Sequence, residues 1–216
     1  MSLRDKRMQK NASQDMKVRL LQAAAKMLAE EGVKALTTRK IATATGTSTM
    51  SVYTHFGSIQ NLVSEMVNFG FAQLDMTLNK TTQHEDPVTY LVGLTQAYIQ
   101  FSRENPHLYA IMFGCVHLGE LRTQESNVLK ENLYTLERIV QAIQVSIEHN
   151  RFGDNVAFLL ANQWWTIVHG FVLLETAKYL LPPNDVTKVL KPLLLNFFVG
   201  LGDQKDQALN SLTVYF

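Results

Sequence analysis

The chain has 216 residues, of which 46% are hydrophobic and 18% charged, and a formal net charge of +1 at neutral pH. This composition is typical of a soluble globular protein of one or two domains and argues against an intrinsically disordered chain. The single cysteine, Cys115, excludes an intrachain disulfide, which fits a reducing compartment such as the cytoplasm. The charged N-terminus lacks the apolar segment that marks a secretory signal.

Charge is distributed unevenly along the chain. Residues 1–57 contain ten Lys and Arg and four acidic residues, a net charge of +6. Residues 58–216 contain ten basic and fifteen acidic residues, a net charge of −5. A basic segment joined to an acidic one indicates a polyanion as partner of the basic segment, although an ordinary solvated surface would have the same charges. The basic residues of the N-terminal arm are Arg4, Lys6, Arg7 and Lys10.

The most apolar stretch, residues 158–177, is about long enough to cross a membrane. It also contains Asn162, Gln163, His169 and Glu175, and each of these side chains is costly to place in lipid. A helix that is apolar on nearly all sides is also what a protein interior or interface demands. We therefore expect a buried helix here and no membrane partner.

Helical periodicity of apolar residues dominates the chain, and no segment has convincing strand periodicity. The pattern predicts an all-α fold of about nine helices. The predicted helices are residues 14–31, 37–45, 48–54, 58–80, 87–104, 106–114, 124–150, 154–181 and 185–202, and the tail 203–216 is expected to be partly ordered.

Two short helices in the first quarter of the chain are separated by a single glycine, Gly46. Thr37 is placed to cap the first helix, and Ser48 or Thr47 the second, because their side-chain oxygens accept hydrogen bonds from the free N–H groups of a first turn. Glycine at position 46 supplies the positive φ that a tight turn requires. The spacing indicates a helix-turn-helix unit, whose second helix enters the major groove of DNA.

Residues 14–80, which include this unit, resemble the N-terminal domain of TetR-family transcriptional regulators. The similarity rests on Leu36-Thr37-Thr38-Arg39-Lys40-Ile41-Ala42, on Gly46, and on Tyr53-Thr54-His55-Phe56. The resemblance implies that DNA is contacted by Thr38, Thr49, Met50, Tyr53, Thr54 and His55. Neighbours in the motif complete the expected DNA-binding set, namely Arg39, Thr47, Ser48 and Ser51. His55 alone fits a capping or packing role equally well.

Two departures from the family pattern weaken the expected grip on DNA, and one is that Thr45 and Thr47 stand where small or aliphatic residues are commoner. The family often has a lysine just inside the helix that follows the recognition helix, whereas this chain has Ile59. The missing positive charge removes one phosphate contact, which the basic N-terminal arm would replace.

The second half of the chain resembles the C-terminal domain of a TetR subgroup marked by a W…HG signature, over residues 87–200. The similarity rests on residues 105–114 (NPHLYAIMFG) and 165–170 (WTIVHG). It implies a ligand-responsive, dimerising helical domain and names no ligand. We therefore expect a DNA-binding domain with a basic arm at residues 1–57. A ligand-binding and dimerisation domain is expected at residues 58–216, with helix 58–80 connecting the two.

Two helices of this second domain have more apolar surface than one core needs, which indicates a homodimer. Small residues on helix 154–181 would let a partner helix approach closely, and helix 185–202 adds large apolar side chains. The expected interface residues are Thr166, Gly170, Leu173, Ala177, Leu190, Leu193, Leu194 and Phe197. A two-fold dimer presents two recognition helices, so the expected partner is a pseudo-palindromic operator in double-stranded DNA.

Aromatic side chains of the middle helices are candidates to line a pocket for a small hydrophobic ligand. The candidate ligand-binding residues are Tyr98, Phe101, Tyr109, Phe113, Trp165 and His169. Aromatic residues at helical spacing also form ordinary cores, and His169 fits a hydrogen-bonded core histidine. A pocket and a plain core are therefore both open at this stage.

These patterns predict a cytoplasmic, dimeric transcriptional repressor that a small-molecule ligand releases from its operator. The alternative is a constitutive DNA-binding or transcription-activating protein whose C-terminal body is packed without a ligand. We expect no enzyme activity, because the chain has no metal-spaced Cys and His set, no glycine-rich phosphate loop and no nucleophile motif. For the same reason we expect no cofactor and no metal.

Overall fold

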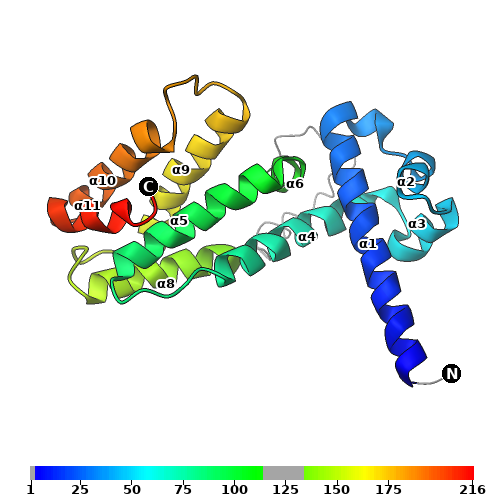
Figure 1. Cartoon of the computed structure of the whole chain (residues 1–216), viewed down its shortest axis with the longest axis horizontal. Helices are drawn as coiled ribbons and strands as arrows, with labels where there is room; N and C mark the ends of the chain where they lie inside the picture. Colours follow the sequence, from blue (N-terminus) through cyan, green and yellow to red (C-terminus); the bar gives the residue numbers. More distant parts are fainter. Residues whose placement is uncertain (1–2, 114–133) are drawn as a thin grey trace. The chain divides into compact units, whose positions relative to one another are not determined.

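Every regular element is a helix among the residues that the computed structural model describes, 3–113 and 134–216 (Figure 1). The predicted all-α fold is therefore confirmed. The chain divides into two compact units, each built from segments that are distant in sequence. Unit 1 comprises Met1–Gln73 and Asn105–Asn132, and unit 2 comprises Leu74–Glu104 and Leu133–Phe216.

Unit 1 contains the N-terminal helices and one short helix from the middle of the chain. Its elements are α1 (Leu3–Glu31), the 3-10 turn η1 (Val33–Ala35), α2 (Thr38–Thr45), α3 (Thr49–Phe56), most of α4 (Ile59–Asn79) and α6 (Pro106–Met112). Helix α1 begins at Leu3 rather than near residue 14, because residues 3–13 include good helix formers although they have no apolar stripe. The expected basic arm is therefore the first part of a helix.

The compact units do not divide the chain at residue 57, where sequence placed the domain boundary, but inside α4. Residues 59–73 of α4 belong with unit 1, and α6 packs against α1 in the same unit. At Gly70, an added Cβ would lie 2.5 Å from the side chain of Met112, so glycine permits α6 to approach α4 closely. The compact units thus differ from the expected functional domains, and the division of function at residue 57 stays a prediction.

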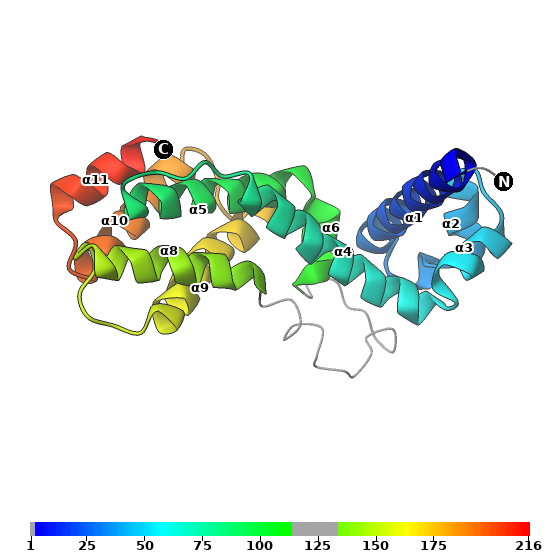
Figure 2. The same ribbon diagram turned by 90° about the horizontal axis from the view of Figure 1, so that it is seen from below.

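Unit 2 contains the remaining residues of α4 and six further helical elements. They are α5 (Pro87–Glu104), α8 (Tyr134–Glu148), α9 (Ala157–Thr176), the π-helical turn η3 (Val186–Leu190), α10 (Lys191–Gly200) and α11 (Lys205–Thr213). Helices α5 and α8 lie side by side in both views, α9 packs against both, and α11 packs against α5 and α10 (Figure 1 and Figure 2). Fully buried side chains at the centre of this packing include Leu91, Ile143, Trp164 and Phe198.

Several predicted helix boundaries in unit 2 need correction. The predicted helix 154–181 is α9, which is shorter and ends at Thr176, shortly before Lys178 adopts a left-handed φ of 60°. The predicted helix 185–202 corresponds to η3 followed by α10, and the tail of the chain forms α11. The first part of the predicted helix 124–150 lies outside the described residues, which resume at α8.

Helix α9 is the one helix among residues 3–113 and 134–216 that is long and apolar enough to cross a membrane. Length and composition alone are weak grounds for a membrane span, since core helices of globular proteins satisfy the same test. In this structure α9 packs against α5 and α8, and 39% of its most apolar window is buried. The rest of this apolar window is accessible, and α9 also contains several of the predicted dimer residues.

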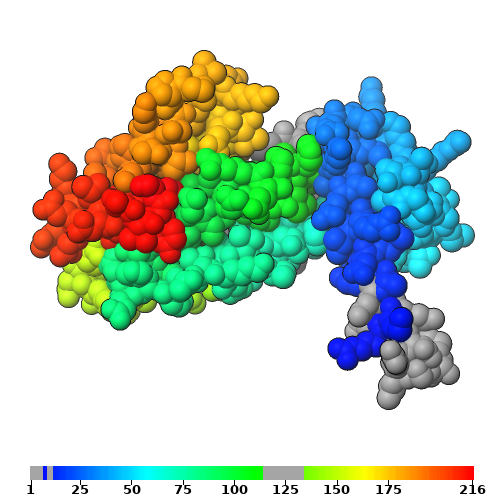
Figure 3. Space-filling model, viewed as in Figure 1, coloured from blue at the N-terminus to red at the C-terminus, as the bar shows by residue number. Residues whose placement is uncertain are grey.

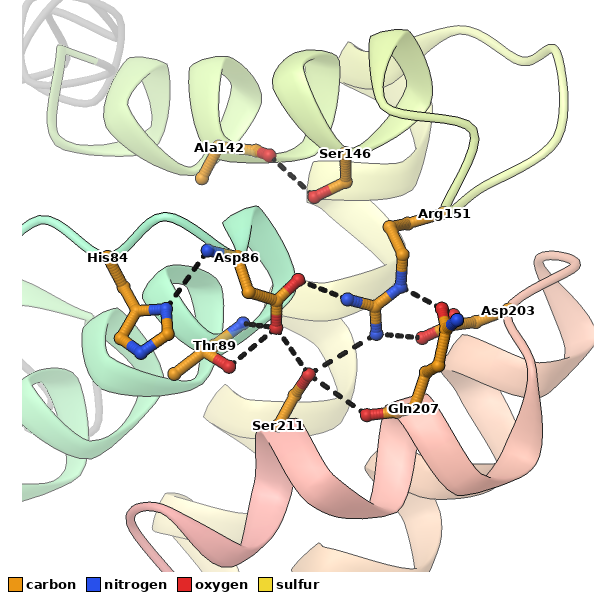
Figure 4. A network of polar contacts seen from close by, with 9 residues as sticks. All are labelled: His84, Asp86, Thr89, Ala142, Ser146, Arg151, Asp203, Gln207 and Ser211. Atoms are coloured by element: carbon orange, nitrogen blue, oxygen red, sulfur yellow. Dashed lines mark hydrogen bonds and ion pairs between the residues drawn. The ribbon is translucent and has the colours of Figure 1, made fainter.

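A buried ion network ties four segments of unit 2 together (Figure 4). The Arg151 guanidinium, between α8 and α9, donates to both carboxylate oxygens of Asp203 at 2.7 Å and to one oxygen of Asp86. Ser211 of α11 donates to Asp86 at 2.6 Å. Thr89 of α5 donates to the same carboxylate from its hydroxyl at 2.5 Å and from its backbone N–H at 3.0 Å. The network thereby fixes the N-terminus of α5 against two turns, the one before α9 that contains Arg151 and the one after α10 that contains Asp203.

One guanidinium in this network faces two carboxylates, and hydrogen bonds from hydroxyl groups supplement it. The side chain of Asp203 is fully buried, and that of Arg151 is 13% exposed. Burial alone would raise the pKa of Asp86, but hydrogen bonds from Ser211 and Thr89 and the charge of Arg151 lower that pKa below its ordinary value of 3.8. The carboxylate of Asp86 is therefore ionised at neutral pH, and its stabilising effect is lost only as the pH falls through the lowered pKa.

Candidate functional site

The helix-turn-helix of unit 1 is organised by hydroxyl caps and one glycine. The Thr37 hydroxyl accepts a hydrogen bond from the Lys40 N–H at 3.3 Å at the start of α2, and the Ser48 hydroxyl accepts one from the Ser51 N–H at 3.2 Å at the start of α3. Between the helices, Gly46 adopts a left-handed conformation with φ 66° and ψ 33°. Both predicted caps and the glycine turn are confirmed, which explains why short helices of poor helix formers are stable here.

Apolar side chains of α2 and α3 anchor the unit to the rest of unit 1. Ile41 of α2 and Val52 and Phe56 of α3 are each at most 5% exposed. The Arg19 guanidinium of α1 donates to the carbonyl oxygen of Thr45 at 2.8 Å, which satisfies a free acceptor at the C-terminus of α2. With one face of α3 held in this way, its opposite face points to solvent.

The exposed face of α3 is formed by Thr49, Met50, Tyr53 and Thr54, and we call it the reading face. Met50 is 70% exposed and Tyr53 is 52% exposed. The Thr54 hydroxyl donates to the Met50 carbonyl oxygen within the helix at 2.8 Å. In the space-filling view, α2 and α3 cover one side of unit 1 beside α1 (Figure 3).

The other predicted DNA-binding residues border the reading face with varied exposure. Ser48 and Arg39 are exposed, and the half-buried ones are Thr38, Thr47, Ser51 and His55. Ring contact with Phe56, at a centroid distance of 6.0 Å, gives His55 a packing role within α3. The structure thus brings the predicted residues onto two adjoining short helices, and the contribution of each to DNA binding stays a prediction.

Two basic side chains of the N-terminal segment have partners within unit 1. Lys40 pairs with Glu31 at 2.8 Å, and Lys17 pairs with Glu65 at 3.0 Å while its ammonium lies 5.9 Å from the Phe56 ring centroid. Sequence reasoning missed Lys17 because its partners are distant along the chain. The surface around α3 is therefore less positive than the composition of residues 1–57 indicates.

In unit 2, three of the predicted ligand-binding residues form one polar cluster. The Trp165 indole N–H donates to the Tyr98 hydroxyl oxygen at 3.2 Å, and that hydroxyl lies 3.1 Å from Nδ1 of His169. Burial lowers the pKa of His169 below its ordinary value of 6.5, so the imidazole is neutral at neutral pH. A neutral ring can accept a hydrogen bond from the Tyr98 hydroxyl at Nδ1.

A second indole next to this cluster is held by a residue that sequence reasoning missed. The Trp164 indole N–H donates to the Thr95 hydroxyl at 3.0 Å, and the Tyr98 ring meets the Trp164 ring edge-on at a centroid distance of 5.9 Å. Thr95 lies one turn before Tyr98 on α5, so helical spacing could have found it. Tyr98, Trp165 and His169 thus lie beside a well-packed aromatic layer.

The other predicted ligand-binding residues are Phe101 of unit 2 and Tyr109 and Phe113 of unit 1. Phe101 of α5 is 1% exposed in the core of unit 2. Tyr109 and Phe113 belong to unit 1, where their ring centroids are 4.7 Å apart. Tyr109 is also 1% exposed. Phe101 and Tyr109 therefore have the burial of ordinary core residues within their units.

The surface of unit 2 also has a shallow depression of about 200 Å³ between the start of α5 and α8. It is smaller than the cavities of about 300–1,000 Å³ that enclose drug-sized ligands. Its lining mixes polar and apolar side chains and shares no residue with the predicted ligand set: Gln83, His84, Glu85, Pro87, Tyr90, Arg138, Gln141, Ala142 and Val145. Across the described part of the chain, no group of three or more His, Cys, Asp or Glu could hold a metal ion.

The predicted dimer residues fall into two classes. Leu190 and Leu194 are fully buried within unit 2, so the prediction that they face a partner is wrong. Their helix is apolar on nearly every side, and periodicity alone could not tell its inner face from its outer face. The accessible residues lie on α9, at its C-terminal cap and on α10, and we call them together the dimer face: Thr166, Gly170, Leu173, Ala177, Leu193 and Phe197.

Comparison with known families agrees with both halves of this description. Residues 20–66 match the family described as "Bacterial regulatory proteins, tetR family", and residues 91–197 match "Tetracyclin repressor-like, C-terminal domain". The chain belongs to the TetR family. It is accordingly a DNA-binding transcriptional regulator with a helix-turn-helix. The finer W…HG assignment stays a prediction.

Individual proteins are similar to the chain at low identity. The chain is 22% identical to the HTH-type transcriptional regulator YobS of Bacillus subtilis strain 168 over 183 residues, 84% of this chain and 90% of YobS. A protein of unknown function from Rhodococcus sp. RHA1 has a TM-score of 0.71 at 23% identity, covering 86% of this chain and 95% of that one. AibR in complex with isovaleryl coenzyme A and operator DNA has a TM-score of 0.59 at 16% identity, covering 86% and 95%. Both solved structures therefore show the shared fold.

Proposed function

We propose that this TetR-family regulator is a homodimeric repressor that binds a pseudo-palindromic operator through α3 and is released by a small hydrophobic ligand held in unit 2. The observation that carries the proposal is the reading face, an exposed surface on a short helix whose caps and packing hold it rigidly. Met50 is 70% exposed and Tyr53 is 52% exposed there, so both side chains are accessible to a partner.

The DNA-binding part follows from the capped ends of α2 and α3. A recognition helix needs a fixed orientation and side chains that reach base edges and phosphates. The proposal assigns Met50 and Thr54 to bases, and Tyr53 and Arg39 to phosphates. Because Lys17 and Lys40 are already paired within unit 1, we expect moderate rather than strong salt dependence of DNA binding.

The homodimer is supported by the apolar surface on α9 and α10. Phe158 is 55% exposed, Leu174 47% and Leu193 46%, although all three lie on helices that pack in unit 2. At Gly170 an added Cβ would meet nothing within 4 Å, so the outer side of α9 is open there. A second copy related by two-fold symmetry would cover this surface and pair two reading faces.

Ligand release is supported by the cluster of Tyr98, Trp165 and His169. It places a few polar groups within an aromatic layer, which is the usual composition of a small-molecule site. AibR, which shares the fold, binds isovaleryl coenzyme A, so acyl-coenzyme A compounds are a reasonable class to test here. Helix α4 contributes residues to both units and is the proposed connection between ligand and DNA.

The direct test measures binding of the full-length protein to the DNA upstream of its own gene by fluorescence anisotropy. We expect salt-sensitive binding that a scrambled duplex does not show, and its absence would refute the proposal. Tyr53→Ala should abolish binding while size-exclusion chromatography still shows a dimer. Tyr179→Ala is the matched control, because Tyr179 is 76% exposed but lies in unit 2.

The ligand is tested separately by thermal shift and by release of DNA. A compound that binds the folded protein must raise its Tm, and a true effector must also lower the affinity for DNA. We would begin with isovaleryl coenzyme A and free short-chain acids. Trp165→Phe removes the indole donor to Tyr98, so it should weaken an effector that binds at this cluster.

One observation favours the alternative of a constitutive DNA-binding protein. Phe101 and Tyr109, both expected to line a pocket, are 1% exposed in well-packed cores. If the C-terminal domain binds no effector, no compound will both raise the Tm of the protein and change its affinity for DNA. A reporter gene placed behind the bound DNA would then distinguish repression from activation.

A further inference from the structure

Helix α3 has an unusual side-chain inventory for a helix that reads DNA. Its eight residues, Thr49–Phe56, include no Arg, Lys, Asn, Gln, Asp or Glu. The strongest base contacts in the major groove are bidentate pairs of Arg or Lys with guanine and of Asn or Gln with adenine, and acidic residues accept from cytosine. The side chains of α3 can form none of these pairs.

The hydroxyl groups of α3 are also partly committed to the protein. The Thr54 hydroxyl donates its proton to the Met50 carbonyl oxygen at 2.8 Å, so toward DNA it retains an acceptor and a methyl group. Ser48, just before the helix, accepts from the Ser51 N–H in its capping role. The O–H donors of Thr49, Ser51 and Tyr53 remain, but α3 has no amide or guanidinium side chain for a bidentate base contact.

Met50 is the most exposed apolar side chain of α3, at 70%. It follows the capped N-terminus by two residues, and this is the end of a recognition helix that meets base edges. Met is flexible and polarizable, so it adapts to an apolar partner without a fixed geometry. In the major groove the only apolar group on a base edge is the 5-methyl of thymine.

We propose that Met50 selects thymine in each half-site by contact with the 5-methyl group, and that this contact, flanked by the Thr54 methyl, is the main base-specific interaction of α3. The inference rests on the proposed operator binding and specifies how the operator is read. Arg39 and Tyr53 then position the helix on phosphates, which carry no sequence information.

The expected size of the effect follows from the hydrophobic contact of one methyl group. Removing a contacted methyl should weaken binding about fourfold, and removing the symmetric pair in both half-sites about fifteenfold. Thymine and deoxyuridine differ only by this methyl group. Replacing one by the other therefore tests the contact without changing any hydrogen-bonding group of the base pair.

The experiment uses a duplex selected by the full-length protein from a random-sequence library. Each thymine in the selected half-site is replaced by deoxyuridine, symmetrically in both half-sites, and affinity is measured by anisotropy for wild type and for Met50→Ala. At one thymine we expect a loss of about fifteenfold for wild type and less than about twofold for Met50→Ala. Met50→Leu should still lose most of this affinity when thymine is replaced by deoxyuridine, because leucine also presents an apolar end to the methyl group.

Arg39→Gln is the matched control, since Arg39 is exposed beside the reading face and is assigned to phosphate. It should weaken binding equally on thymine and deoxyuridine duplexes and reduce the salt dependence. Circular dichroism would verify the fold of Met50→Ala, which is expected to be intact because Met50 is largely exposed.

The outcomes separate this inference from the proposed function. If the library yields no selected duplex, operator binding itself fails. If a duplex is selected but no thymine gives a deoxyuridine penalty that Met50→Ala removes, operator binding stands and methyl readout by Met50 is overturned.

Discussion

In unit 2 the strongest polar contacts are buried and join segments that are far apart in sequence, whereas in the helix-turn-helix of unit 1 they lie near the surface within one or two turns. Arg151 reaches Asp203 and Asp86, which are 52 and 65 residues away. Thr37 and Ser48 reach only three residues along their own helices. Polar groups thus organise tertiary structure in unit 2, whereas in the helix-turn-helix they mainly fix the local backbone, apart from the contact of Arg19 with the Thr45 carbonyl oxygen.

This difference has a functional consequence. Local caps fix the ends of α2 and α3 without using the outer side chains of α3, so the reading face stays available for DNA. In unit 2, the buried network fixes α5 and α11 around a core and leaves an apolar surface on α9 and α10 for a partner. Disrupting the two kinds of contact should therefore have very different costs.

The largest expected effect is the loss of Arg151. Arg151→Leu leaves the fully buried Asp203 carboxylate without its partner, so the free energy of unfolding should fall by about 3–5 kcal/mol. Arg103→Leu is the control, because the side chains of Arg103 and Glu175 are 42% and 28% exposed. Their ion pair should contribute about 0–1 kcal/mol to the free energy of unfolding. Urea unfolding followed by circular dichroism measures both. Equal losses would show that the buried network is not what organises unit 2.

The second prediction separates the inner and outer faces of α10 with two neighbouring leucines. Leu194 is fully buried and Leu193 is 46% exposed. Leu194→Ala should lower the free energy of unfolding by about 2–5 kcal/mol, because it leaves a cavity in the core. Leu193→Glu should leave the fold intact but place a charge in the proposed dimer interface. Light scattering should then show a monomer, and a persistent dimer would place the interface elsewhere.

The features that the sequence predicts best are those determined by residues close together along the chain. Thr37, Gly46 and Ser48 act through hydrogen bonds and backbone angles within a few residues, so composition and spacing were sufficient to place the turn and both caps. Apolar periodicity predicted an all-α fold for the same reason. Helix α1 was predicted too short because the signal used was an apolar stripe, which its first residues lack.

Long-range contacts could not be predicted in this way. No local pattern links Arg151 to Asp86 or Asp203, since their proximity depends on how α5, α8 and α11 pack. Leu190 and Leu194 were assigned to the dimer because helical spacing identifies apolar faces but not which face meets the core. The individual DNA contacts of the reading face depend on a partner molecule, so neither the sequence nor the fold of the chain determines them.

The third prediction concerns the local caps of unit 1. Thr37→Ala removes the acceptor for the Lys40 N–H and should lower the free energy of unfolding by about 1 kcal/mol. Thr43→Ala is the control within the same helix, because its exposed hydroxyl only donates back to the Arg39 carbonyl oxygen. That change should be neutral or slightly stabilising, since alanine is the better helix former. Thermal unfolding compares the two, and an equal effect would exclude a specific capping role for Thr37.

The smallest expected effect is a pH dependence that comes from His169 in unit 2. Burial lowers the pKa of His169 below 6.5, so the unfolded chain binds a proton more readily than the folded chain does. The stabilising contribution of the neutral ring is complete above pH 6.5 and is lost as the pH falls toward the lowered pKa. Between pH 7.5 and 5.5, the Tm of wild type should therefore fall slightly more than that of His169→Asn. The asparagine retains an acceptor for the Tyr98 hydroxyl but does not titrate, so equal falls would show that His169 is not the buried neutral group its contacts indicate.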